Sequence, residues 1–135
     1  MRKDSINSDH VGEININYPS HQTYKDAKLN KETFDFRYEK LKHYIPEGSV
    51  CLDIGSHIGN FTLLFASCAG KEGKVLAFEP NPHCYEPLTE TVKDNPTLNI
   101  IPINVGCTEE TKKYTFNFAN DQYGHNNGGY YKESK

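Results

Sequence analysis

Two carboxylates, Asp53 and Glu79, are the residues best suited to chemistry, because each interrupts or ends a short apolar segment. The first segment, residues 50–54, is almost continuously apolar, which predicts a strand that is buried on both faces of a parallel sheet. A carboxylate at the end of such a strand is costly to bury alone, so we expect Asp53 to have a ligand or a hydrogen-bond donor beside it. Residues 74–79 repeat the arrangement, with Glu79 at the end of a second short strand.

A glycine-containing turn follows Asp53 and leads into a helix. Gly55 and Gly59 bracket the turn, and glycine allows both a positive φ and the close approach of a ligand to the main chain. Gly70 is placed to cap the C-terminal end of the helix. The helix itself is predicted from an apolar stripe at helical spacing, formed by Ile58, Phe61, Phe65 and Cys68. The whole stretch is therefore interpreted as a ligand-binding strand, turn and helix.

Three ligands compete for such a turn, and its side chains discriminate among them. A P-loop needs a lysine that reaches the phosphates, but Phe61 occupies that position. A dinucleotide fingerprint needs two further glycines, and His57 and Asn60 stand in their places. S-adenosylmethionine has no phosphate but carries an ammonium, a sulfonium and a ribose diol, so a carboxylate at the strand end suits it. Glu79 lies about one βαβ unit further on, where an acid binds the ribose hydroxyls with its two oxygens.

Each carboxylate also has a purely structural interpretation. Asp53 could cap the glycine turn, and Glu79 could simply end a strand. Together, at this separation, the two favour contact with a cofactor.

The sequence D-I-G-S-H-I-G-N-F-T-L, residues 53–63, followed by F-E-P-N-P, residues 78–82, resembles the FkbM-type branch of the class I S-adenosylmethionine-dependent methyltransferases. The resemblance covers residues 46–106. It implies an α/β fold with a Rossmann-like parallel sheet, flanking helices, and the cofactor across the ends of the first strands. It also implies O-methylation of a hydroxyl on a small-molecule or glycan substrate.

The resemblance extends to individual positions of the cofactor site. His57 replaces the middle glycine of the usual family motif, and it is either a base or a loop histidine exposed beside the methionine moiety. The catalytic group is not identified. The residues that the resemblance assigns to the cofactor are Asp53, Gly55, Ser56, His57, Gly59, Asn60, Glu79, Asn81, Gly106 and Cys107.

Composition narrows the class of protein. The 135 residues fit one domain, and 15 basic against 18 acidic residues give a formal charge of −3, so we expect no nucleic-acid partner. We expect no membrane contact, because no apolar run approaches a bilayer-spanning length and the N-terminus is polar. The four cysteines lack C-x-x-C spacing, which favours reduced thiols in the core over disulfides or zinc ligands. We therefore expect no metal site and a cytoplasmic location.

The remaining elements are predicted from caps and periodicity. Residues 30–45 form a helix capped by Asn30, and Asn81 with Pro82 starts another helix. The stretch 98–105 is a strand at a sheet edge, because Pro102 lacks a ladder donor. An alternating stretch, residues 113–118, predicts a half-buried antiparallel strand.

Three regions follow from these elements. Residues 1–29 are predicted to be a polar N-terminal arm, mostly loop, in which 14–18 form an edge strand. Residues 30–119 form a partial Rossmann-like S-adenosylmethionine-binding domain, and 120–135 form a flexible tail. The resembled family continues beyond this length, so the sheet is expected to be truncated before its later strands. One edge of the strand at 50–54 then lacks its neighbour, which favours a partner chain or self-association there.

Two other functions stay open at this point. The first is a non-catalytic module that binds S-adenosylmethionine or a nucleoside, derived from a truncated or split methyltransferase. The second, and weaker, is an NAD-binding oxidoreductase domain.

Overall fold

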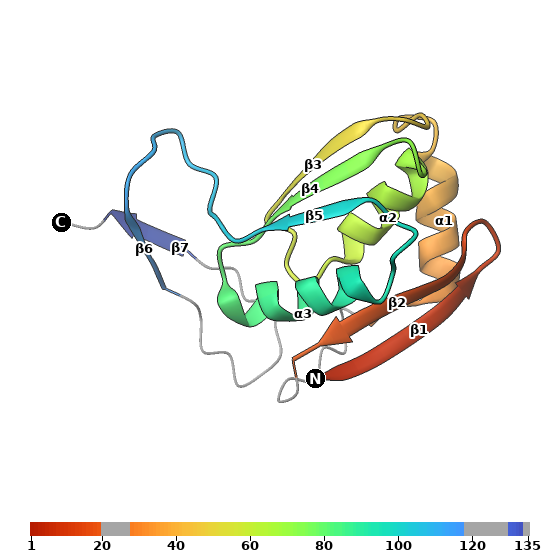
Figure 1. Ribbon diagram of the computed structural model, residues 1–135, viewed down its shortest axis with the longest axis horizontal. Helices are drawn as coiled ribbons and strands as arrows, with labels where there is room; N and C mark the ends of the chain where they lie inside the picture. Colours follow the sequence, from red (N-terminus) through yellow and green to blue (C-terminus); the bar gives the residue numbers. More distant parts are fainter. Residues whose placement is uncertain (20–27, 118–129, 134–135) are drawn as a thin grey trace.

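A computed structural model of the chain describes residues 1–19, 28–117 and 130–133 (Figure 1). These residues form two antiparallel pairs, β1–β2 and β6–β7, and a parallel sheet with the strand order β3-β4-β5. The elements, in chain order, are β1 (Arg2–Ser8), β2 (Gly12–Tyr18), α1 (Lys31–Leu41), β3 (Val50–Ile54), α2 (Asn60–Ala69), β4 (Lys74–Phe78), α3 (Pro82–Lys93), β5 (Ile100–Ile103), β6 (Tyr114–Asn117) and β7 (Tyr130–Glu133).

The parallel sheet confirms the predicted Rossmann-like architecture. Helix α2 connects β3 to β4 and helix α3 connects β4 to β5, so the carboxyl ends of all three strands meet at one edge of the sheet. The register places Asp53 opposite Ala77, and Phe78 opposite Ile103. Strand β5 is an outer strand of the described sheet, as Pro102 predicted, and β3 is the other.

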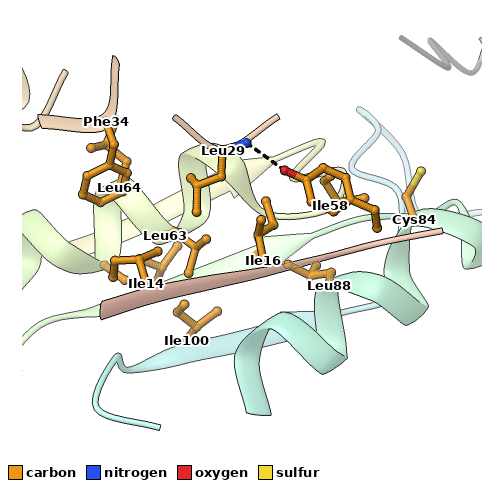
Figure 2. Packing of buried hydrophobic residues seen from close by; sticks show 14 residues of the cluster. Ile14, Ile16, Leu29, Phe34, Ile58, Leu63, Leu64, Cys84, Leu88 and Ile100 are labelled. Atoms are coloured by element: carbon orange, nitrogen blue, oxygen red, sulfur yellow. Dashed lines mark hydrogen bonds between the residues drawn. The ribbon is translucent and has the colours of Figure 1, made fainter. Parts of the chain in front are cut away.

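Helices cover one face of this sheet (Figure 1). Helix α2 packs on β3 and β4, and α3 packs on β5, over the face that carries the buried Val75, Ala77 and Ile100. Figure 2 shows the core between these elements, where Leu63 of α2 and Leu88 of α3 contribute side chains to the same cluster.

The opposite face corrects the prediction that the strand at 50–54 is buried on both sides. Val50, Leu52 and Ile54 are 60%, 60% and 64% exposed, because alternation along β3 directs them away from the helices. Only the alternate positions, Cys51 and Asp53, face the helical layer and are partly or fully buried. The described part of the fold therefore has two layers, the sheet and the helices, and the outer face of the sheet is apolar.

The strand predicted at 14–18 is confirmed, because it lies within β2, but the expectation that the rest of the N-terminal arm is mostly loop is wrong: residues 2–18 form a hairpin. Strands β1 and β2 pair from Arg2–Tyr18 to Ser8–Gly12, and Ile14, Ile16 and Tyr18 are at most 2% exposed. The Tyr18 hydroxyl accepts a hydrogen bond from the backbone N–H of Leu29 at 2.7 Å, shown in Figure 2. The hairpin is therefore part of the core. Its intervening asparagines made the sequence look polar.

Those asparagines are buried because the α3 region supplies their partners. The backbone N–H of Asn15 donates to Asn95 Oδ1 at 2.9 Å, and Asn95 Nδ2 donates back to the Asn15 carbonyl at 2.7 Å. The backbone N–H of Asn17 donates to Thr91 Oγ1 at 2.9 Å. Side chains thus pair with the outer backbone edge of β2, where another strand would otherwise bind.

Helix α2 differs from the predicted stripe. Phe61 is 45% exposed, whereas Leu63 and Leu64 are buried. The helix is enclosed on several sides, because it contacts α1 as well as β3 and β4. The predicted C-cap is confirmed, since Gly70 has a φ of 68° and its N–H donates to the Ala66 carbonyl at 3.0 Å.

Both predicted N-caps are confirmed. Asn30 Oδ1 accepts from the Thr33 N–H at 3.0 Å, and Asn81 Oδ1 accepts from the His83 N–H at 3.0 Å. Helix α1 ends earlier than expected, at Leu41.

The C-terminal elements are partly as predicted. Strand β6 pairs antiparallel with β7, which confirms the strand at 113–118. The flexible tail predicted for 120–135 is wrong for 130–133, which form β7, and the rest of it lies outside the described residues.

All four cysteines are free thiols. Burial raises the pKa of Cys68 to about 11 and that of Cys84 to about 12, which keeps both protonated at neutral pH. Of the helices that the structure describes, none has the length and hydrophobicity that crossing a bilayer requires.

Candidate cofactor site

The glycine turn is bonded directly to the end of the neighbouring strand. The N–H groups of Gly55 and Ser56 both donate to the Phe78 carbonyl, at 2.9 and 3.0 Å. Gly55 and Gly59 have φ angles of 81° and 101°, so the predicted positive φ is confirmed at both positions. The turn after β3 therefore lies against the last residue of β4, immediately before Glu79.

Glu79 joins the turn after β3 to the start of α3. Its Oε2 accepts from the backbone N–H of His57 at 2.8 Å, and its Oε1 accepts from the backbone N–H of Asn81 at 2.7 Å. The residue is only 6% exposed. A buried carboxylate that receives two main-chain donors is fixed in orientation.

Asp53 is also buried, at 8% exposure, and is held by the first turn of α2. Thr62 Oγ1 donates to Asp53 Oδ2 at 2.5 Å. Burial raises the pKa of Asp53, and the Thr62 hydrogen bond opposes that rise. Burial likewise raises the pKa of Glu79; the two backbone donors oppose this, and the charge of Asp53 raises it further. The charge of Asp53 therefore acts on Glu79, as expected if the two carboxylates share one region.

The structure gathers most of the predicted site residues at the carboxyl edge of the sheet. His57 has a φ of 54°, and burial lowers the pKa of its imidazole. The expectation of an exposed histidine is wrong, because the ring is half-buried where its backbone is tied to Glu79. Asn60 is the first residue of α2. Gly106 and Cys107 follow β5, and no hydrogen bond between described residues joins them to this group.

Sequence reasoning missed two residues that support the carboxylates. Thr62 binds Asp53, and Asn104 Nδ2 donates to the Glu79 backbone carbonyl at 2.7 Å. The available signal for Asn104 was its position directly after β5, since the ends of parallel strands share one edge. The corresponding signal for Thr62 was a hydroxyl side chain in the first turn of the helix that follows the strand of Asp53.

Replacing Gly59 with alanine is expected to lower the free energy of unfolding by about 1–2 kcal/mol, because a side chain disfavours its positive φ. The new Cβ would also lie 2.9 Å from Leu88 Cδ1, a side-chain end that can shift. Gly12→Ala is the matched control, because Gly12 has a φ of 79° and nothing within 4 Å of the added Cβ. Urea unfolding of both variants tests this. A larger loss in Gly12→Ala than in Gly59→Ala would contradict the contact.

The pH dependence of stability should reveal the burial of Asp53. Its pKa in the fold lies above the ordinary value of 3.8, so between the two pKa values the folded chain binds more protons than the unfolded chain. The stability contributed by Asp53 is therefore lost as pH rises through that window. Relative to Asp53→Asn, which does not titrate, the wild type should lose stability between pH 4 and pH 7. Urea unfolding at both pH values measures the difference, and an unchanged difference would contradict the assignment.

Comparison with known proteins gives a family and a fold. Residues 53–134, more than half of the chain, match the family model described as a methyltransferase FkbM domain. No curated protein matches the chain significantly.

Three solved structures are similar over part of their length. Precorrin-6y C5,15-methyltransferase from Geobacter metallireducens is 18% identical with a TM-score of 0.50, over 67% of this chain and 48% of that one. This likeness supports the Rossmann-like fold. A putative rRNA-methylase from Clostridium thermocellum has a TM-score of 0.48 at 22% identity, over 58% and 45%. Aeropyrum pernix fibrillarin, solved with S-adenosyl-L-methionine, has a TM-score of 0.46 at 16% identity, over 77% and 52%. The chain spans about half the length of these proteins.

Proposed function

The chain belongs to the FkbM family of methyltransferases, and from this premise we propose that it binds S-adenosylmethionine at the carboxyl edge of the β3–β4–β5 sheet for transfer of the cofactor's methyl group. S-adenosylmethionine is the cofactor that the family and the fold imply. The observation that supports this site most strongly is the placement of Asp53 and Glu79 on neighbouring strand ends, with the glycine turn bonded between them.

The residues fit this cofactor by charge and geometry. Each oxygen of Glu79 accepts one backbone N–H and keeps lone-pair capacity for a ribose hydroxyl. Asp53 provides negative charge for cationic groups, whereas two carboxylates would repel a pyrophosphate. The positive-φ glycines allow the ligand to approach the main chain. This chemistry disfavours the NAD-binding alternative.

When bound, the cofactor supplies a methyl group activated by a sulfonium. The chain's part is to hold the nucleoside with Glu79, to place the charge of Asp53 nearby, and to keep the turn rigid through Gly55 and Ser56. Much of the acceleration of an in-line displacement comes from such positioning. We propose a hydroxyl on a small molecule or sugar as the acceptor, on the strength of the family resemblance.

A second candidate is a module that binds the cofactor without catalysis. The exposed apolar side chains of Val50, Leu52 and Ile54 support it, because in the described part of the chain helices cover one face of this sheet, whereas doubly wound folds carry helices on both faces. On either proposal, the edge of β3 is the place where another polypeptide strand would pair. A cytoplasmic location stays a prediction.

Titration calorimetry tests the cofactor, with S-adenosylmethionine, S-adenosylhomocysteine and NAD as the ligands. We expect the two adenosyl sulfur compounds to bind and NAD not to bind. Binding of NAD alone, or of none of the three, would overturn the proposal. Transfer of a labelled methyl group to hydroxylated sugars then separates an enzyme from a binding module, since the module would bind S-adenosylhomocysteine without transferring anything.

A further inference from the structure

A cavity of about 280 Å³ lies between α1 and the start of α2. Its apolar part is formed by Leu29, Phe34 and Leu64, which are buried. Its polar part consists of Lys28, Asn30, Thr33, Arg37 and Asn60. Asn60 directly follows Gly59, so the cavity adjoins the glycine turn of the proposed cofactor site.

The charge of this cavity is opposite to that of the chain. Two cations, Lys28 and Arg37, line it, and its described lining includes no acid, although the chain carries a formal charge of −3. Two acids of α1 are engaged elsewhere: Asp35 pairs with Lys31 and Glu39 pairs with Lys42, each at 2.8 Å. Within the described ranges, neither Arg37 nor Lys28 has a carboxylate within ion-pair distance.

Arg37 is positioned by an aromatic ring. Its guanidinium carbon lies 5.0 Å from the ring centroid of Phe61, in the first turn of α2. A cation–π contact of this kind restrains the guanidinium without using its N–H groups as hydrogen-bond donors to a carboxylate, and a guanidinium can donate two parallel hydrogen bonds to such a group.

We propose that this cavity binds a ligand carboxylate, with Arg37 as its main donor and Lys28 as a second cation. A carboxylate matches the forked geometry of a guanidinium, and the apolar part of the cavity accommodates the carbon atoms attached to it. The inference rests on the proposed function for its neighbouring ligand. The carboxylate belongs either to the amino-acid end of S-adenosylmethionine or to an acidic acceptor.

The first experiment compares S-adenosylhomocysteine with methylthioadenosine, which has the same nucleoside but no amino-acid end. If the carboxylate belongs to the cofactor, Arg37→Gln should weaken the binding of S-adenosylhomocysteine about tenfold and leave the binding of methylthioadenosine unchanged. Lys40→Gln is the matched control, because Lys40 lies on the same helix but over Phe36, 5.4 Å from that ring's centroid, and does not line the cavity.

The second experiment uses glucuronate as an acidic sugar and glucose as its uncharged counterpart, each with and without S-adenosylhomocysteine. If the carboxylate is the acceptor's, Arg37→Gln should lose glucuronate binding and keep S-adenosylhomocysteine binding. The proposal is overturned if Arg37→Gln changes neither ligand, or if Lys40→Gln has the same effect. If the wild type binds no nucleoside at all, the proposed function fails. Binding of glucuronate without cofactor, lost in Arg37→Gln, would still support a carboxylate site in the cavity.

Discussion

Replacing Glu79 with glutamine is expected to weaken the binding of S-adenosylhomocysteine by about 1–3 kcal/mol, roughly one to two orders of magnitude in Kd. Glutamine has one acceptor oxygen where the carboxylate has two. Its NH₂ group must therefore face either the His57 N–H or the Asn81 N–H, both of which now donate to Glu79. One donor loses its acceptor, and the ribose loses one as well. Titration calorimetry measures the change.

Glu86→Gln is the control, because Glu86 is an exposed residue of α3 with the same change of charge. The unfolding free energy of both variants should be recorded, so that a weakened turn is separated from a weakened ligand contact. If Glu79→Gln binds S-adenosylhomocysteine as tightly as the wild type does, Glu79 is not part of the site.

Replacing Asn95 with alanine is expected to lower the free energy of unfolding by about 2–4 kcal/mol. The Asn95 side chain accepts from the Asn15 N–H and donates to the carbonyls of Asn15 and Thr91. It is 4% exposed, so water cannot readily replace these bonds. The variant should unfold at lower urea concentration and should expose the edge of β2.

The matched control is Asn7→Ala, which removes an exposed asparagine from the same hairpin. Hydrogen exchange at the Asn15 amide provides a second measurement, because this amide should lose protection in Asn95→Ala and keep it in Asn7→Ala. Equal stability of the two variants would mean that Asn95 does not hold the hairpin.

Local signals in the sequence predicted the features that depend on neighbouring residues. The caps at Asn30 and Asn81, the C-cap at Gly70 and the turn glycines were all anticipated, because each is decided within a few residues. The outer position of β5 was anticipated from Pro102, which lacks a ladder donor. These features fix where the two carboxylates lie.

Features that depend on distant partners could not be predicted in this way. The burial of β2 relies on Thr91 and Asn95, more than seventy positions away along the chain. The orientation of α2 depends on α1, and the exposure of one face of β3 depends on what packs against it.

The same division holds for the candidate site. Asp53 and Glu79 were recognisable because their spacing is regular, whereas Thr62 and Asn104 support them through contacts that no motif encodes. The resemblance placed Gly106 and Cys107 in the site, but the hydrogen bond from the segment after β5 comes from Asn104. Whether Gly106 and Cys107 contact the cofactor stays a prediction.

The apolar outer face of β3 allows mutations to test whether another polypeptide covers this face in the cell. Polar replacements at Val50, Leu52 or Ile54 remove little packing from the described part of the chain, because these side chains contact mainly solvent. If cells select against such replacements, we expect these three side chains to be buried in an assembly with another polypeptide. If cells tolerate the replacements, the side chains stay exposed in the functional form.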